Sequence, residues 1–332
     1  MVATPKESAP DPRAASAYVW ALAQVNLTSA SFAPASADAS FRRYFRLESG
    51  GESWILMDAP PDKENCEPFL HVDKLLLDAG LHAPIVHAQN LKRGFLLLSD
   101  LGRRTYLNVL DENNADRMFA DAIDALIKWQ LASRVNELPA YDDALLRREI
   151  RLFPDWYVAK HLKRELTPAQ RSAWQSMEDL LIGRALAQSR VYVHRDYMPR
   201  NLMVSTPNPG ILDFQDAVYG PISYDIVCLF RDAFLSWPEE RVREWRKRYW
   251  DAARAAHLPV PSSYGEFVRD FDLMGVQRHL KVLGIFARIN YRDGKPHYLK
   301  DTPRFIRYVR DVAIQYDELK PLLKLFDEMG LQ

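Results

Sequence analysis

The sequence predicts an α+β protein with a small antiparallel-sheet region at its amino-terminal side and a larger, mainly helical region after it. In the first region, alternating strand-like residues lie on both sides of Gly50 and Gly51, a pattern typical of a β-hairpin. From Asn114 onward, apolar residues recur at the three- and four-residue spacing of amphipathic helices. We therefore expect two lobes, residues 1–100 and 101–332, with residues 1–12 disordered.

Periodicity and turn residues predict the individual elements in order. In the first lobe we expect a short helix at 14–26, the hairpin around Gly50, a helix at 66–79 and a strand within 94–102. In the second lobe, helical periodicity is found around 119–130 and near 142–163, 167–187, 238–257, 264–292 and 301–328. A strand-loop-strand unit at 191–214 interrupts these helices.

Composition excludes several classes of protein. The 44 basic and 44 acidic residues balance, so net charge gives no reason to expect nucleic acid or a membrane surface as a partner. Cys66 and Cys228 stand alone in the sequence, which predicts neither a disulfide framework nor a zinc site and fits the reducing cytoplasm. No apolar run approaches the ~20 residues of a membrane span. The sequence indicates no obligate protein partner.

The stretch "VYVHRDYMPRNLMVS" (191–205) places charged residues between two apolar runs, and buried charges need partners or a metal. The following "TPNPG" supplies turn residues before "ILDF", so we expect the chain to fold back as a hairpin. This fold would bring Asp196, Asn201 and Asp213 together. Two carboxylates and an amide are oxygen ligands that suit Mg²⁺.

The strings "HRDYMPRN" (194–201) and "DFQD" (213–216) match the catalytic set of protein-kinase-like phosphotransferases. The chain therefore resembles the bilobal kinase-like fold of the aminoglycoside phosphotransferase and choline kinase families. Strings along most of the chain are also similar to the bacterial N-acetylmuramate/N-acetylglucosamine kinases of cell-wall recycling: "DASFRRYFR" (38–46), "MDAPP" (57–61), "YDDALLRRE" (141–149), "PNPGILDFQDAVYGPISYDI" (207–226) and "DLMGVQRHLKVLGIFARI" (272–289).

This resemblance implies an ATP- and Mg²⁺-dependent sugar kinase. Such an enzyme would phosphorylate the anomeric hydroxyl of the amino sugar and supply a salvage route to UDP-N-acetylmuramate. Asp196 would accept the proton of the sugar hydroxyl, and Asn201 and Asp213 would hold the metal. His194 is expected to hold the loop, and Asp225 to accept backbone N–H groups of that loop.

The nucleotide site departs from the protein-kinase pattern. No G-x-G-x-x-G precedes the hairpin, and Met57 stands where the phosphate-binding lysine is expected. We expect the phosphates to contact a loop containing Ser40 and a side chain of Arg43 or Arg46. These arginines lie on opposite faces of the strand because strand side chains alternate, and the sequence does not say which face meets the nucleotide. By resemblance, the base is expected at Leu98, Ser99 and Asp100.

For the acceptor sugar, polar and aromatic residues near the loop are candidates: Trp156, Arg200, Tyr219, Tyr224, Arg278 and His279. On a helix, Arg278, Lys281, Arg288 and Arg292 would fall within an arc of roughly 80°. Such a stripe is more often a solvated helix face. Its functional interpretation is a site for the lactyl carboxylate of N-acetylmuramate.

Two other functions are compatible with the same loop. One is a kinase of an aminoglycoside or another amino alcohol, although a polycationic acceptor usually needs an acidic cleft and the 278–292 stripe is basic. The other is a regulatory, nucleotide-binding pseudokinase, which the absent lysine and glycine-rich loop favour and the intact Asp196, Asn201 and Asp213 disfavour.

Overall fold

The computed structural model of the protein describes residues 11–36 and 41–332. The chain divides into two compact units. The first contains the chain up to Asp78, His82–Arg103 and Met203–Gln215, and the second contains Ala79–Leu81, Arg104–Leu202 and Asp216–Gln332. Residues 203–215 thus belong with the amino-terminal sheet although they come late in the chain. A lobe boundary at residue 100 stays a prediction.

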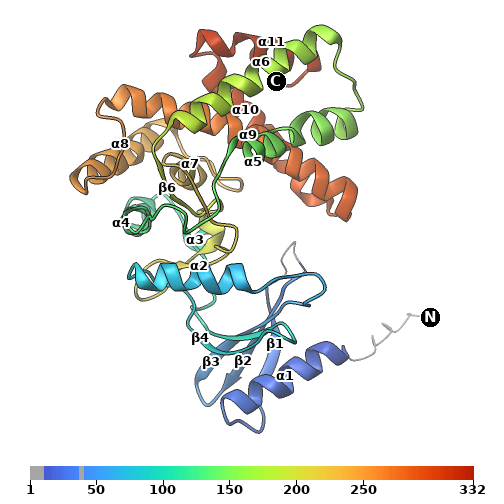
Figure 1. Cartoon of the computed structure of the whole chain (residues 1–332), viewed down its shortest axis with the longest axis vertical. Coiled ribbons are helices and arrows are strands. Elements are labelled where there is room, and N and C mark those ends of the chain that lie inside the picture. Colours follow the sequence, from blue (N-terminus) through green and yellow to red (C-terminus); the bar gives the residue numbers. More distant parts are fainter. Residues whose placement is uncertain (1–10, 37–40) are drawn as a thin grey trace. The chain divides into compact units, whose positions relative to one another are not determined.

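The first unit is built on a five-stranded antiparallel sheet (Figure 1). In spatial order its strands are β1 (Ser31–Ser36), β2 (Arg43–Ser49), β3 (Glu52–Asp58), β5 (Phe95–Ser99) and β4 (Val86–Asn90). Strands β2 and β3 form the predicted hairpin. Its turn needs positive φ angles, and Gly50 and Gly51 have φ of +61° and +87°. The α+β prediction is confirmed.

Helix α1 (Pro12–Gln24) covers one face of this sheet. Asp11 caps the helix, since its carboxylate accepts the backbone N–H groups of Arg13 at 3.0 Å and Ala14 at 3.1 Å. The buried residues that join helix and sheet are Ala17, Ala21, Leu22, Leu47, Leu56, Phe95 and Leu97. Side chains alternate along each strand, so Met57 and Leu96 point to the other face.

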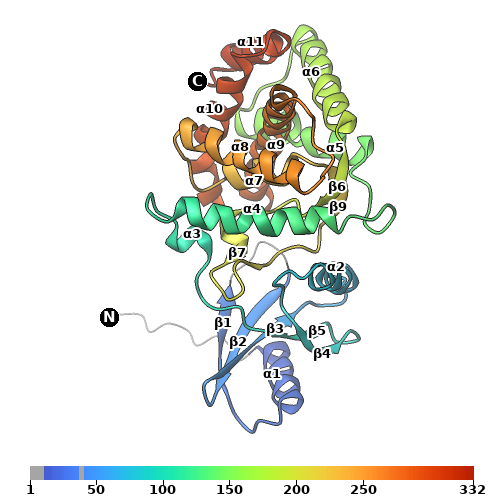
Figure 2. The ribbon, with the colours of Figure 1, turned by 90° about the vertical axis from the view of Figure 1, so that its left-hand side faces the viewer.

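Helix α2 (Glu67–Asp78) lies over that other face (Figures 1 and 2), where Met57 and Leu96 are fully buried. It corresponds to the helix predicted at 66–79. Asp73 on its inner side is only 3% exposed, and its Oδ1 has no hydrogen-bond partner among the residues that the structure describes. Burial raises the pKa of Asp73 to about 7.

The segment 203–215 is fastened to the first unit by polar and aromatic contacts. Strands β7 (Leu202–Met203) and β8 (Gly210–Ile211) pair with each other, which confirms the predicted fold-back with strands of only two residues. The backbone N–H of Ile211 donates to the His82 carbonyl at 2.8 Å. The ring of Phe214 packs on Phe69 of α2 with centroids 4.8 Å apart. Residues on both sides of Phe214 are therefore held near α2.

The second unit is mainly helical, as predicted (Figure 2). Its α-helices are α3 (Tyr106–Val109), α4 (Ala115–Leu131), α5 (Asp143–Ile150), α6 (Pro168–Ala187), α7 (Tyr224–Phe230), α8 (Glu239–Ala255), α9 (Tyr264–Asp293), α10 (Thr302–Ala313) and α11 (Lys320–Met329). The other helical elements are the π-helix η1 (Phe153–His161) and the 3₁₀ turns η2 (Pro199–Asn201), η3 (Pro296–Asp301) and η4 (Asp317–Leu319). None of the helices described is long and apolar enough to cross a membrane.

Helix α9 is the centre of this unit, since α5, α6, α7, α8, α10 and η1 all contact it. Gly284 permits one close approach, because a Cβ there would lie 2.2 Å from the carbonyl carbon of Leu152. Strand β6 (Arg190–Val193) pairs antiparallel with β9 (Val218–Pro221). No strand was expected at 218–221. Residues 194–217 connect these two paired strands, so the end of β6 fixes the start of the polar loop at residue 194.

We predict that Asp73→Asn stabilises the protein at neutral and alkaline pH. Between the ordinary aspartate pKa of about 3.9 and the raised pKa of about 7, the folded state keeps a proton that the unfolded state has lost. The free energy of unfolding of the wild type therefore falls as pH rises through this window, and asparagine removes that fall. We expect a gain on the order of 2 kcal/mol at about pH 8 that vanishes below about pH 4, measured by urea unfolding. Asp78→Asn, at the exposed end of the same helix, serves as control, and equal pH profiles for wild type and Asp73→Asn would contradict the prediction.

Candidate active site

The loop at 194–201 follows β6, and Asp225 of α7 holds its backbone. The Asp225 carboxylate accepts the N–H of His194 at 2.7 Å and of Arg195 at 3.0 Å. Arg195 has a left-handed φ of +76°, which is unfavourable for a residue with a side chain, so these bonds stabilise a strained turn. Burial raises the pKa of the fully buried Asp225 to about 7. The supporting role predicted for Asp225 is confirmed.

Glu149 of α5 ties the same loop to helix α9. Its carboxylate forms ion pairs with Arg195 of the loop and, at 3.0 Å, with Lys281 of α9. The Tyr141 hydroxyl donates to it as well. Burial alone would raise the pKa of Glu149, but the charges of Lys281 and Arg195 outweigh burial and hold the pKa below its ordinary value. Glu149 is therefore a buried anion with two cations around it.

Asp196 and Asn201 lie together in this loop. The Asn201 side-chain amide donates to the Asp196 carbonyl at 3.0 Å, and the Asn201 backbone N–H donates to the Met198 carbonyl at 2.8 Å. Asp213 belongs to the first unit, has a left-handed φ of +64° and accepts a hydrogen bond from the Gln215 side chain at 2.9 Å. The meeting of all three side chains around one metal stays a prediction. Their hard oxygen donors fit Mg²⁺.

Two buried cations of α9 act electrostatically on the loop. Arg278 is 2% exposed and Lys281 is 7% exposed, so the solvated-face interpretation of the basic stripe is wrong for these two residues. Burial lowers the pKa of Lys281, but Glu149, Tyr224 and Asp196 more than offset this and raise it. Arg292 at the end of α9 is exposed and pairs with Asp293.

Arg278 has unusually few partners for a buried guanidinium. It donates one hydrogen bond, to the Arg231 carbonyl at 3.3 Å, and none of the carboxylates that the structure describes lies within ion-pair distance of it. Burial lowers its pKa, whereas nearby acidic groups that include Asp196 and Asp232 raise it above its ordinary value. A buried cation without a bonded anion is costly, which makes Arg278 a candidate for binding an anionic ligand.

The other predicted sugar-binding residues have different surroundings. The Arg200 guanidinium lies 5.2 Å from the Phe234 ring, and the buried Tyr224 hydroxyl accepts a hydrogen bond from Lys281 at 3.0 Å. His279 is buried among aromatic rings, 5.0 Å from that of Tyr308, and burial lowers its pKa well below the ordinary value. Half-buried positions are found for Trp156 and Tyr219. Sugar contacts by these residues stay predictions.

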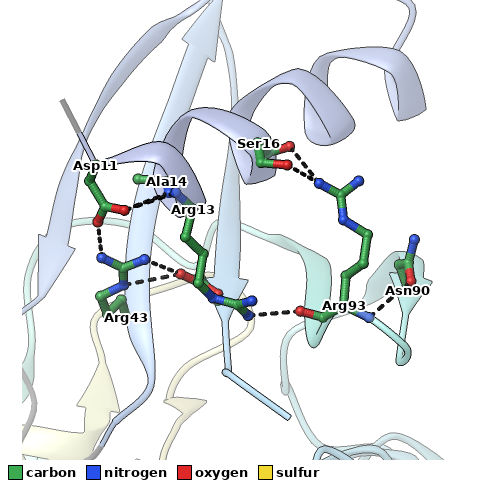
Figure 3. Close-up of polar contacts among 8 residues, drawn as sticks. Asp11, Arg13, Ala14, Ser16, Arg43, Asn90 and Arg93 are labelled. Carbon is green, nitrogen blue, oxygen red and sulfur yellow. Dashed lines mark hydrogen bonds and ion pairs between the residues drawn. The ribbon is translucent and has the colours of Figure 1, made fainter. Parts of the chain in front are cut away.

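Arg43 and Arg46, the predicted phosphate ligands, both have carboxylate partners. Arg43 pairs with the fully buried Asp58 and with Asp11 at the cap of α1 (Figure 3). Arg13 of α1 also reaches Asp58, at 2.6 Å. Arg43 shares a strand face with Phe45 and Leu47, which pack against α1, so its ion pairs help to dock α1 on the sheet. Its phosphate contact stays a prediction.

Arg46 points to the face of the sheet opposite α1. Its guanidinium forms an ion pair with Asp100, with one N–O distance of 2.9 Å, and donates a hydrogen bond to the Gly102 carbonyl at 2.7 Å. Burial raises the pKa of Asp100, but the hydrogen bonds from Arg46, Gly102 and Ser53 and the charge of Arg46 together outweigh burial and lower it. Ser99 exchanges hydrogen bonds with the Ile85 backbone at 2.8 and 2.9 Å. The segment from Leu98 to Asp100 is thus braced, and its contact with the nucleotide base stays a prediction. The predicted phosphate contact of Ser40 falls on a residue outside the described part of the chain.

The sequence of the chain is similar to those of known proteins. Residues 31–267 match the phosphotransferase enzyme family. The chain belongs to this family. An N-acetylmuramate/N-acetylglucosamine kinase of Pseudomonas putida is 59% identical over 299 residues, which cover 90% of this chain and 88% of the relative.

Solved structures of the family share the fold. The choline kinase LicA of Streptococcus pneumoniae has a TM-score of 0.61 and 15% identity, over 90% of this chain and 98% of its own. An ADP-bound aminoglycoside phosphotransferase, APH(2'')-Ib, has a TM-score of 0.57 and 14% identity, over 89% and 97% of the two chains. The predicted kinase-like fold is confirmed, and the chain is a phosphotransferase.

The sequence did not reveal the roles of Glu149 and Gln215. Glu149 ends the string "YDDALLRRE", but one acid among several charged residues near the end of a short helix gives no sign of burial. Its partner Lys281 lies more than a hundred residues further along the chain. The only signal for Gln215 is its place in "DFQD", two residues after Asp213.

We predict that Glu149→Gln destabilises the protein by about 3–5 kcal/mol, because it leaves Arg195 and Lys281 buried without their anion. Urea unfolding near neutral pH measures the effect. Asp143→Asn is the matched control on the same helix, since Asp143 forms an exposed pair with Arg147 and exposed pairs contribute at most about 1 kcal/mol. A Glu149→Gln variant as stable as the Asp143→Asn variant would contradict the buried-anion role.

Proposed function

We propose that the protein is an ATP-dependent kinase that phosphorylates the anomeric hydroxyl of N-acetylmuramate and N-acetylglucosamine in peptidoglycan recycling, and so feeds UDP-N-acetylmuramate salvage. The name and 59% identity of the Pseudomonas putida relative support the acceptor sugars. The ADP in a solved structure of the same fold supports ATP as the donor. The geometric observation on which the proposal chiefly rests is a catalytic loop held by Asp225 and Glu149 beside two buried cations.

In this mechanism Asp196 accepts the proton of the sugar hydroxyl as that oxygen attacks the γ-phosphoryl group. Asn201 and Asp213 would hold Mg²⁺, which neutralises charge on the phosphate oxygens when bound. Lys281 lies within electrostatic range of Asp196, since that carboxylate contributes to the raised pKa of Lys281. The loop contacts of Asp225 and Arg195 fix the orientation of Asp196 before substrate arrives.

For sugar recognition, we infer that Arg278 binds the lactyl carboxylate of N-acetylmuramate. The guanidinium is buried and lacks a bonded anion in the described chain, and a guanidinium and a carboxylate match in geometry and charge. A second positive group, Lys281, lies one turn further along α9. This charge disfavours a polycationic aminoglycoside as the acceptor. The intact and well-anchored loop disfavours a pseudokinase.

Asp196→Asn tests the chemical step. We expect turnover to fall by at least about 100-fold, as is typical for loss of a general base, while ADP still binds. A coupled assay of ATP consumption with each sugar measures turnover, and NMR of the product locates the phosphate. Asp179→Asn, a change at an exposed acid of α6, is the control. Full turnover by Asp196→Asn, or no turnover of either sugar by the wild type, would refute the assignment.

Arg278→Met tests recognition of the carboxylate. A charge-assisted hydrogen bond contributes about 1.5–3 kcal/mol, so kcat/KM for N-acetylmuramate should fall about 10- to 100-fold more than kcat/KM for N-acetylglucosamine, which lacks that carboxylate. Removing a buried cation without a bonded anion should leave thermal stability equal or higher. Arg292→Met on the exposed end of α9 is the control. Equal losses for both sugars would argue against this role of Arg278.

A further inference from the structure

Gln215 is bonded directly to the carboxylate that the proposed function assigns to the metal. Its side-chain N–H donates to Asp213 Oδ1 at 2.9 Å. The two residues flank Phe214, which is fully buried and packs on Phe69 of α2. All of these residues belong to the same compact unit. The orientation of the Asp213 carboxylate is thus linked to the packing of α2 through a hydrogen bond and a buried ring.

The backbone conformation of Asp213 is uncommon for a residue with a side chain. Its φ of +64° is left-handed, a region that residues with a Cβ enter at a cost in free energy. In this conformation the side chain points away from the direction that an extended strand would give it. A donor two residues later therefore fixes a carboxylate that its own backbone does not hold in a common geometry.

The other end of the same amide lacks a partner. Gln215 Oε1 is shielded from solvent and has no hydrogen-bond partner in the described part of the chain. A buried carbonyl oxygen without a donor costs about 1–3 kcal/mol. Mg²⁺ usually keeps several of its waters when carboxylates bind it, and such waters are hydrogen-bond donors. The amide can thus donate to the metal ligand and accept from the hydrated metal.

We propose that Gln215 is a positioning residue for the metal: it orients the Asp213 carboxylate through its N–H, and its Oε1 would accept a hydrogen bond from the water shell of the bound ion. The proposal rests on the function proposed above. A neutral amide suits this position, because it provides a donor and an acceptor and adds no charge beside the carboxylate. Outer contacts of this kind commonly change metal affinity by about 10- to 100-fold.

Gln215→Met tests the proposal, since methionine keeps the length and volume of glutamine but has no N–H donor. Manganese binding to the ADP complex, followed by electron spin resonance of free Mn²⁺, measures metal affinity without turnover. We expect affinity at least about 10-fold weaker than in wild type, with an unchanged ADP affinity in EDTA. The Mg²⁺ concentration for half-maximal kinase activity should rise in parallel.

Gln175→Met is the matched control, because Gln175 donates a similar hydrogen bond, of 3.1 Å, to Asp179 on an exposed face of α6. Gln215→Asn is the second variant: it retains a polar amide that its surroundings tolerate, but it is too short to span the same distance, so it should also weaken Mn²⁺ binding. Thermal unfolding without metal confirms that each variant is folded.

Wild-type Mn²⁺ affinity in folded Gln215→Met and Gln215→Asn would overturn the role of Gln215 and leave the kinase assignment intact. A wild-type protein that binds ADP but neither Mn²⁺ nor Mg²⁺, and phosphorylates neither sugar, would overturn the proposed function itself. Weaker Mn²⁺ binding in both Gln215 variants, with wild-type binding in Gln175→Met, supports the proposal.

Discussion

The catalytic loop depends on one buried carboxylate, that of Asp225, which accepts two consecutive backbone N–H groups at 2.7 and 3.0 Å. Its burial raises its pKa, so the interior disfavours its charge, and the two N–H groups offset part of that penalty. Those bonds fix the left-handed Arg195 and thereby the direction of Asp196. The position of Asp196, the proposed proton acceptor, therefore depends mainly on the backbone conformation of the loop.

The buried charges near Asp225 in the second unit differ in how many partners of opposite charge they have. Glu149 meets two cations, Arg195 and Lys281, while Arg278 has only a carbonyl as its bonded partner. A buried cation without an anion reduces stability, yet it creates a site where an anionic group binds without first displacing a protein carboxylate. A buried guanidinium without a bonded carboxylate suits anionic groups such as phosphate and carboxylate.

The sequence predicted the parts of the structure that local patterns determine. The Gly50-Gly51 hairpin and the long helices follow from φ preferences and apolar spacing, and the loop was found from its residue types. The β6–β9 pairing, the burial of Arg278 and Lys281, and the Glu149 cluster depend on residues far apart in the chain. A basic stripe on a helix looks the same in sequence whether it faces water or a buried acid. Long-range packing decides between these outcomes.

The first unit has fewer cations available for phosphate than its composition suggests. All three arginines near the start of β2 have carboxylate partners: Arg42 with Glu64, Arg43 with Asp58 and Asp11, and Arg46 with Asp100. An arginine that binds phosphate must first leave its carboxylate and expose a partly buried acid, which costs free energy. The β3 strand has Met57 and no lysine, and on α2 Asp73 is a buried acid, while Lys74 is exposed and pairs with Asp78.

Under the proposed function, the charge of a bound triphosphate would therefore be met mainly by a metal ion and by backbone N–H groups. A metal ion that neutralises most of the triphosphate charge would need a carboxylate ligand with a fixed orientation. In this chain Asp213 has an uncommon backbone conformation, and the Gln215 amide and the Phe214 ring hold it in place. Under the proposed function, the absence of a strand lysine and the braced Asp213 carboxylate would meet one electrostatic requirement: positive charge that the side chains of the sheet do not supply would come from a metal ion, which Asp213 would help to hold.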